Sequence, residues 1–418
     1  MTTLHRRTAM LALLLILSLV AAACADDPED TGDEEATEEA AAEPTEEEAA
    51  EPPEEEAPAT EEEPAATEEE PAATEEEPAA TEGEATTFTT LEDACAAYEG
   101  VEIPEDFNVG LVTDIGRVDD GTFNQFAYDG MQAASECLGF ETSFIETASE
   151  ADYATNITSI LDGDPEVVVT VGFLIADATL EAANNNPDVN FIGIDQFQEE
   201  FPENYVGILF REDQGGFLAG AMGALLSESG TIGAVGGLET VPPVVRFLNG
   251  YQTGAQYVNP DINVLTVYTD SFTDPAQGQS AAQQFLGEGA DVIFGAGGQT
   301  GSGAIQTAAE NGAWAIGVDQ DEYFTTFGGG SSPGADRLAT SAVKRVDLGT
   351  FIQIGDVLAG SFEGGIFTLD AANGGITYAP FHDADIPEDV ATQIEEIRAG
   401  LADGSIETGV DPATGELL

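Results

Sequence analysis

The chain has 418 residues, and 81 acidic side chains against 9 lysines and arginines give it a formal charge of −72. Residues 25–90 carry 28 acids and no lysine or arginine, whereas residues 91–418 carry 53 acids and 7 bases. A surface this acidic repels phosphate backbones, which argues against DNA or RNA as a partner. The stretch from residue 91 onward exceeds one ordinary domain and predicts two lobes.

Lysine occurs once, at Lys344. An acid-rich, lysine-poor surface is typical of proteins that stay hydrated in concentrated salt, and an acidic mesophilic surface is the alternative. We expect the folded part to lose stability at low ionic strength, because unscreened repulsion among its acids favours expansion.

Residues 1–23 are predicted to form an export signal. His5, Arg6 and Arg7 precede an apolar run over 10–23, which is too short to span a bilayer. The run ends in AAAC at 21–24, which resembles a lipoprotein processing box and predicts a lipid on Cys24. Cleavage by an ordinary signal peptidase is the alternative, and the arginine pair hints at twin-arginine export.

Residues 24–90 are predicted to be a disordered tether. They consist almost entirely of Glu, Ala, Pro, Thr and Asp, with three copies of EEEPAAT over 61–81. Such a segment has too little apolar surface to offset its ordering entropy, and its charges extend it. We interpret it as a spacer between a membrane and the two-lobed domain at 91–418.

Strand-like and helix-like patterns alternate through that domain. Apolar strand-like runs lie at 108–113, 166–171, 190–194, 205–210, 231–235, 263–268, 291–294, 314–318 and 338–342. Helical patterns between them include 123–137, 214–226 and 275–286. This alternation predicts an α/β fold with parallel sheets, in which ligands bind at the carboxyl ends of the strands. The strand ends supply Asp114, Gly172-Phe173, Asp195, Gly297-Gly298 and Asp319.

Several motifs resemble those of one family in matching order over roughly 107–365. They are VTDIGRVDDGTFNQ at 112–125, GFLIADA at 172–178, DQGGFLAG at 213–220, PVVRF at 243–247, SFTDP at 271–275, GVD at 317–319 and TSAVKRVD at 340–347. They resemble the basic membrane protein (BMP, PnrA-like) family of substrate-binding lipoproteins of ABC transporters.

The resemblance implies a type I periplasmic-binding-protein fold, with two Rossmann-like lobes joined by a hinge of three crossovers. Lobe one is expected at about 91–209 with 343–370, and lobe two at about 210–342 with 371–418. The implied function is delivery of a small molecule, most often a purine nucleoside in this family, to the permease and ATPase of an importer. The implied location is the extracytoplasmic face of the cell membrane, through the lipid on Cys24.

Motif positions then assign a ligand-binding set, to which two strand-end residues, Phe173 and Gly297, are added. The set is Asp114, Phe123, Asn124, Phe173, Asp195, Phe272, Gly297, Asp319 and Lys344. Ionised carboxylates accept hydrogen bonds from ribose hydroxyls, and two phenylalanines from opposite lobes suit a flat base between them. The alternatives for single residues are a helix N-cap for each aspartate and lobe core for each phenylalanine.

No catalytic residues, cofactor or metal are expected. After removal of the signal, His382 is the one histidine, which leaves no Ser-His-Asp arrangement and no histidine metal site. The glycine-rich segment 295–303 lacks the Walker lysine, so we interpret it as a helix-entry turn. Two alternative functions remain. A ligand-sensing subunit of a receptor would have the same pocket, and a carboxylate-dependent nucleoside or glycoside hydrolase would need only Asp and Glu side chains.

Cys95 and Cys137 are predicted to form a disulfide. With a lipid on Cys24 they are the two cysteines left, and an exported protein meets an oxidising compartment. The bond would pin the N-terminal segment to lobe one. Two separate buried thiols are the alternative.

Overall fold

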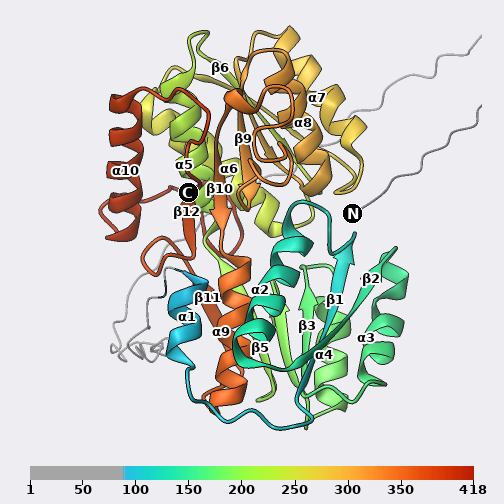
Figure 1. Ribbon diagram of the computed structural model, residues 1–418. Helices are drawn as coiled ribbons and strands as arrows, with labels where there is room; N and C mark the ends of the chain where they lie inside the picture. The colour runs from blue at the N-terminus through green and yellow to red at the C-terminus, as the bar shows by residue number, and fades with distance from the viewer. Residues whose placement is uncertain (1–87, 89) are drawn as a thin grey trace, which may run out of the picture. The chain divides into compact units, whose positions relative to one another are not determined.

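The computed structural model describes Phe88 and residues 90–418 of the chain, which form two six-stranded sheets with flanking helices (Figure 1). The predicted signal segment, Cys24 and nearly all of the predicted tether lie outside the described residues.

The first sheet is parallel throughout, in the order β11-β5-β4-β3-β1-β2. Its strands are β1 (Asn108–Ile115), β2 (Glu141–Thr147), β3 (Val167–Val171), β4 (Asn190–Ile194), β5 (Tyr205–Phe210) and β11 (Gly365–Leu369). With its helices it makes up what we call the first lobe. These are α1 (Leu91–Ala97), α2 (Phe123–Leu138), α3 (Tyr153–Leu161), α4 (Ala176–Asn185) and α9 (Val346–Ala359).

The second sheet has the order β12-β10-β9-β8-β6-β7 and is parallel except for the β10–β12 pair. Its strands are β6 (Thr231–Gly236), β7 (Asn263–Tyr268), β8 (Val292–Ala296), β9 (Trp314–Asp319), β10 (Leu338–Lys344) and β12 (Ile376–Tyr378). The helices of this second lobe are α5 (Glu212–Leu226), α6 (Pro242–Val258), α7 (Pro275–Gly287), α8 (Gly298–Glu310) and α10 (Glu388–Ala402).

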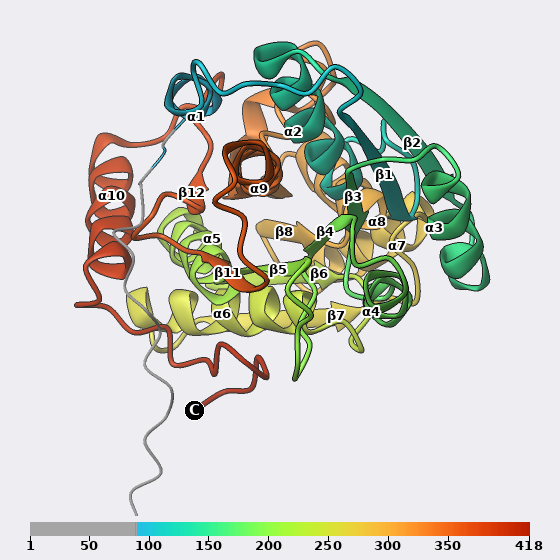
Figure 2. The same cartoon turned by 90° about the horizontal axis from the view of Figure 1, so that it is seen from below.

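The chain passes from one sheet to the other three times: after β5, after β10 and after β11. Helices pack in pairs in both lobes, α2 with α9 and α3 with α4 in the first, and α5 with α6 and α7 with α8 in the second. Figure 2 shows α5 and α6 lying alongside each other, with α10 beyond α5. The prediction of a two-lobed α/β fold with parallel sheets is confirmed.

Three strands were not predicted from the sequence: β2, β11 and β12. Each lies at an edge of its sheet, where one side has no neighbouring strand. Only the last residue of β2 is buried, and β11 likewise buries only its last residue. Edge strands need fewer apolar residues than central ones, so their sequences lack the continuous apolar run that marks β3 or β8.

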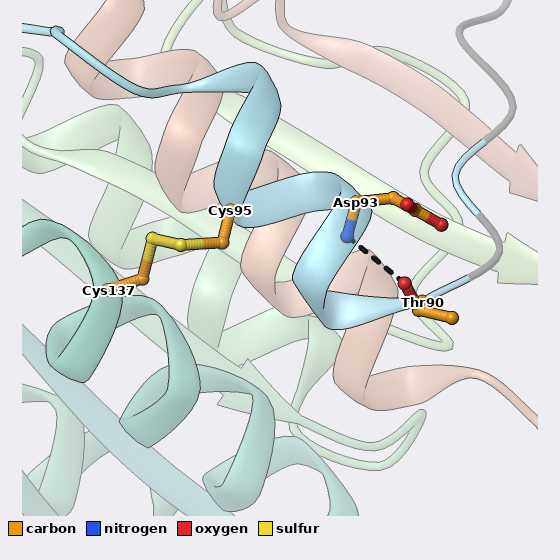
Figure 3. Close-up of a disulfide and its surroundings, with 4 residues drawn as sticks. All are labelled: Thr90, Asp93, Cys95 and Cys137. Carbon is orange, nitrogen blue, oxygen red and sulfur yellow. Dashed lines mark hydrogen bonds between the residues drawn. A yellow bond between two sulfur atoms is a disulfide. The ribbon is translucent and has the colours of Figure 1, made fainter.

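A disulfide joins Cys95 in α1 to Cys137 near the end of α2, with their Cα atoms 6.0 Å apart (Figure 3). At the start of α1 the Thr90 hydroxyl accepts a hydrogen bond of 3.0 Å from the Asp93 N–H. At the end of α1 the Tyr98 hydroxyl donates to the Ile352 carbonyl of α9, at 3.0 Å. The disulfide and the Tyr98 hydrogen bond together tie the N-terminal helix to the α2–α9 layer of the first lobe.

Among the described residues, no helix combines the length and the apolar character needed to cross a bilayer.

Loss of the disulfide should destabilise the fold. Its cysteines are separated by 42 positions, and releasing a loop of that length increases the entropy of the unfolded chain by an amount worth about 4 kcal/mol. We expect the Cys95→Ser/Cys137→Ser protein to lose about that much free energy of unfolding in urea. As a control, thiol titration of the denatured, unreduced Cys24→Ser protein should find no free thiol, and two free thiols would contradict the bond.

Candidate functional site

A cavity lies between the lobes, lined from both sheets near the carboxyl ends of the strands. All nine residues predicted to bind ligand line it: Asp114, Phe123, Asn124, Phe173, Asp195, Phe272, Gly297, Asp319 and Lys344. None of the three aspartates caps a helix, because the N-cap positions of the described helices belong to other residues. The helix-cap alternative for these residues is therefore wrong.

On the first lobe, Asp114 and Asn124 hold each other in place. The Asn124 Oδ1 atom accepts the Asp114 backbone N–H at 3.0 Å, and its Nδ2 group donates to Asp120 Oδ2 at 3.0 Å. Asp120 also accepts the backbone N–H groups of Thr122, the N-cap residue of α2, and of Gln125 in its first turn. Asn124 thus has one amide hydrogen without a partner among the described residues, and its orientation is set by Asp114 and Asp120.

The Asp114 carboxylate has one occupied oxygen and one unoccupied oxygen. Its Oδ1 accepts from the Ile115 N–H at 2.7 Å and from the Tyr153 hydroxyl, while Oδ2 makes no hydrogen bond within the described residues. Burial raises the pKa of Asp114 to about 6, against the lowering effect of those two donors. At Gly172, whose φ is +98°, an added Cβ would lie 2.1 Å from this Oδ2. A side chain there would displace the carboxylate.

Between the lobes, four buried charged groups form a chain of ion pairs. The Lys344 ammonium, at the end of β10, lies 2.6 Å from Asp195 Oδ2 and 2.8 Å from Glu212 Oε1. The other Glu212 oxygen lies 2.6 Å from Nε of Arg246 in α6. Asp195 follows β4 of the first lobe, so the chain spans both lobes. We call Asp195, Lys344, Glu212 and Arg246 the charge chain.

The electrostatics of the charge chain follow from burial and pairing. Burial would raise the pKa of Glu212, but the Arg246 guanidinium and the Lys344 ammonium together hold it below its ordinary value. Burial would lower the pKa of Lys344, and its two carboxylate partners raise it instead. Burial raises the pKa of Asp195 despite Lys344, and its Oδ1 atom, which is buried, has no hydrogen-bond partner within the described residues. That oxygen is an acceptor without a donor at the edge of the cavity.

Asp319 supplies a further buried carboxylate, from the opposite lobe. It ends β9 with a φ of +64°, as Asp195 follows β4 with a φ of +61°. Its side chain makes no hydrogen bond or ion pair with any other described residue, although it is only 7 % exposed. Burial raises its pKa to about 7, with Lys344 opposing the rise.

Aromatic rings reach the cavity from both lobes. Phe123 begins α2 in the first lobe, and Phe272 lies in the loop between β7 and α7 in the second. Both are partly buried against the core of their own lobe while lining the cavity. An added Cβ at Gly237 would lie 2.1 Å from the Phe272 ring, so this glycine leaves the space that the ring occupies.

The site offers carboxylate acceptors, side-chain amides and phenylalanine rings from both lobes. The cavity is lined by Asp114, Asp120, Asp195 and Asp319, and the positive charge of Lys344 is already shared with Glu212. Such a set suits an uncharged, flat ligand rich in hydroxyl donors. No group of three or more metal-ligating side chains was found among the residues that the structure describes.

Sequence reasoning missed three residues that hold the site together: Glu212, Arg246 and Asp120. Glu212 stands one position before the motif at 213–220, and Arg246 lies within the motif at 243–247. One signal available in the sequence was the scarcity of basic residues. With only 7 bases in residues 91–418, a single arginine inside an apolar segment has to be explained by a buried partner.

The raised pKa of Asp319 makes stability depend on pH. Its pKa of about 7 in the folded protein exceeds the value of about 4 expected in the unfolded chain, so folding takes up a proton between these values. The free energy of unfolding therefore falls as the pH rises from about 4 to about 7, and the loss is complete above pH 7. We expect Asp319→Asn, which also tolerates a positive φ, to raise the ligand-free melting temperature by at least about 2 °C at pH 8 and by less at pH 5.

Glu310→Gln is the matched control, because it removes one negative charge from an exposed position at the end of α8. It should leave the melting temperature nearly unchanged at both pH values. Equal shifts in the two variants would mean that net charge, and not the burial of Asp319, governs the effect.

Known proteins similar to this chain share its fold and its motifs. The CD4+ T-cell-stimulating antigen of Listeria monocytogenes is 31% identical over 326 residues, which cover 74% of this chain and 89% of the relative. The ABC transporter nucleoside-binding protein BmpA of Lactococcus lactis is 32% identical over 291 residues, covering 66% and 82%. A crystal structure of an ABC transporter system solute-binding protein from Aeropyrum pernix superposes with a TM-score of 0.64 at 27% identity, covering 72% of this chain and 92% of that one.

The sequence pattern of the Bmp family, described as ABC transporter substrate-binding proteins of the PnrA-like type, matches residues 107–399. This match spans both sheets and every residue of the charge chain. The fold is the type I periplasmic-binding-protein fold, as the solved solute-binding proteins also indicate. The chain therefore belongs to the Bmp family of PnrA-like ABC transporter substrate-binding proteins.

Proposed function

We propose that this protein binds a purine nucleoside and delivers it to the permease and ATPase of an ABC importer. The observation that carries the proposal is the composition of one cavity. Three aspartates with oxygens unoccupied by protein donors line the same space as Phe123 and Phe272, which come from opposite lobes. A ribose supplies hydroxyl donors for the carboxylates, and a purine supplies a flat ring for the two phenylalanines.

Each half of a nucleoside meets complementary chemistry in this arrangement. The remaining amide hydrogen of Asn124 can reach an acceptor on the purine edge, since its other polar contacts are already made with Asp114 and Asp120. The Lys344 ammonium lies 5.0 Å from the centre of the Phe123 ring and orders that face of the cavity. The relative from Lactococcus lactis, named a nucleoside-binding protein, lends further support to this ligand class.

The site also disfavours a phosphate. A 5′-phosphate adds nearly two negative charges at neutral pH, and the cavity is already lined by four aspartates. Arg246, the arginine of the charge chain, is paired with Glu212 and buried. The ligand should therefore be the nucleoside and not the nucleotide.

Calorimetry with guanosine, adenosine and inosine should show binding, and the corresponding monophosphates should bind at least about a hundredfold more weakly. That ratio corresponds to ~2.7 kcal/mol, less than burial of an anion beside carboxylates costs. Equal affinities for nucleoside and nucleotide would contradict the placement of the carboxylates.

Aromatic variants provide the control for stacking. Phe123→Ala and Phe272→Ala should each weaken nucleoside binding by roughly 5- to 150-fold, the range that one base-stacking contact is worth. Phe324→Ala removes a ring that is 62% exposed and does not line the cavity, so it should bind as the parent does. Normal binding by both cavity variants would remove the stacking half of the proposal.

We further propose that the mature protein is held at the extracytoplasmic face of the membrane by a lipid on Cys24. The apolar run that ends in small residues at this cysteine supports the proposal. In the native host, the parent protein should partition into detergent phase, and Cys24→Ser should appear in the aqueous phase because it lacks the acyl chains. A Cys24→Ser protein that still partitions with membranes would contradict lipidation.

A further inference from the structure

An Asp-Gln dipeptide occurs at the ends of two equivalent strands, one in each lobe, but its glutamine makes different contacts in the two places. β4 and β9 hold the same place in the strand orders of the two sheets. Asp195 follows β4 and Asp319 ends β9, both with positive φ, and each is followed by a glutamine, Gln196 or Gln320. The positions are therefore equivalent in backbone and in sequence, and a difference between their side chains points to a specific role.

Gln196 is bonded entirely within the first lobe. Its Nε2 group donates to the carbonyls of Thr170 and Gly172 at 3.2 and 3.0 Å, and its Oε1 accepts from the Tyr205 hydroxyl. These contacts brace the ends of β3 and β4 against each other. Gln196 thus has a structural part in its own lobe.

Gln320 instead reaches across to the other lobe. Its Nε2 group donates to the backbone carbonyl of Thr122 at 3.0 Å, and both residues are buried. Thr122 immediately precedes Phe123 and Asn124, and Gln320 immediately follows Asp319. The bond therefore joins the ligand-facing segment of one lobe directly to that of the other.

The surroundings of this bond fit a contact that forms when the lobes close. An added Cβ at Gly121 would lie 3.7 Å from Thr325 Cβ, so the second-lobe loop that follows β9 packs directly on the first-lobe turn before α2. The hydroxyls of Thr122 and Thr325 are buried there without a hydrogen-bond partner among the described residues. Forming this contact gains one hydrogen bond but takes two hydroxyls out of water, so the hydrogen bond offsets only part of the cost of burying them.

We propose that Gln320 is a positioning residue that latches the two lobes through the Thr122 carbonyl and thereby slows release of the ligand. It touches neither the base nor the sugar of the ligand in this scheme. Its effect is on the stability of the closed arrangement, and hence on the dissociation rate more than on the association rate. The latch rests on the proposed function only in the choice of guanosine as the probe.

The first test is stopped-flow binding of guanosine to the full chain. Gln320→Leu keeps the volume of the side chain but removes the donor, so dissociation should become roughly 3- to 10-fold faster, the factor that one hydrogen bond is worth, with association nearly unchanged. Gln306→Leu is the matched control, because Gln306 Nε2 donates to the Thr326 carbonyl at 3.1 Å within the second lobe. Equal dissociation rates for the parent and Gln320→Leu, or equal effects of the two variants, would overturn the proposal.

Gln320→Glu separates a latch from a merely structural role. An ionised carboxylate cannot donate to the Thr122 carbonyl, whereas a protonated carboxyl can. Relative to the parent at the same pH, this variant should release guanosine much faster at pH 8 and approach the parent rate near pH 5. A ratio of rates that does not change with pH would contradict the donor role of Gln320.

A third experiment measures the distance between the lobes without ligand, so it distinguishes failure of the latch from failure of the nucleoside proposal. Spin labels at the exposed positions Thr155 on α3 and Ser280 on α7, introduced as Thr155→Cys and Ser280→Cys in the Cys24→Ser protein, report the distance between the lobes. Gln320→Leu should shift the ligand-free distribution toward longer distances, and Gln306→Leu should not. If the parent fails to bind guanosine, this comparison alone decides the latch, and an unchanged distribution overturns it.

Discussion

The charge chain is the interaction on which the rest of the structure depends. Its four ionised groups are 7 % exposed or less, and they come from the position after β4, the end of β10, the first residue of α5 and the second turn of α6. Ions are tolerated at such depth only when every one is paired, and removal of one partner leaves an uncompensated charge. Because Lys344 and Glu212 lie where the chain crosses between the sheets, this requirement ties the hinge, both lobes and the cavity to one arrangement.

The character of the cavity follows from the way the charge chain distributes charge. Lys344 is shared between Asp195 and Glu212, and Arg246 is bound by Glu212, so little positive charge remains for Asp114 and Asp319. Those two carboxyls are buried with raised pKa values, and the free energy of unfolding of the ligand-free protein is lower where they ionise. Ligand hydroxyls would supply the missing donors. The proposed donor-rich ligand would therefore raise the free energy of unfolding more than a ligand without donors would.

The sequence indicated the central strands and the residues at their ends, because a buried parallel strand is a continuous apolar run and its carboxyl end opens onto the cleft. The edge strands β2, β11 and β12 were missed, since one open side relaxes the demand for apolar residues. Glu212 and Arg246 were missed for a different reason. They are 34 positions apart, and nothing local to either residue indicates that they meet. Pairs of this kind are settled by how α5 packs on α6, which single-sequence patterns do not contain.

The two lobes repeat one framework, and both the charge chain and the proposed latch lie at places where the repeat breaks. At the first crossover Arg211 binds Asp213 through two nitrogens, and at the second Arg345 binds Asp347 in the same way. Between the members of these pairs stands Glu212 in one case and Val346 in the other. The equivalent aspartate–glutamine pairs diverge too, with one glutamine bracing its own lobe and the other crossing the cleft. The repeated framework places the two lobes alike. The charged hinge arises because Glu212 stands where the other crossover has Val346, and the proposed latch arises because Gln320, unlike Gln196, bonds across the cleft.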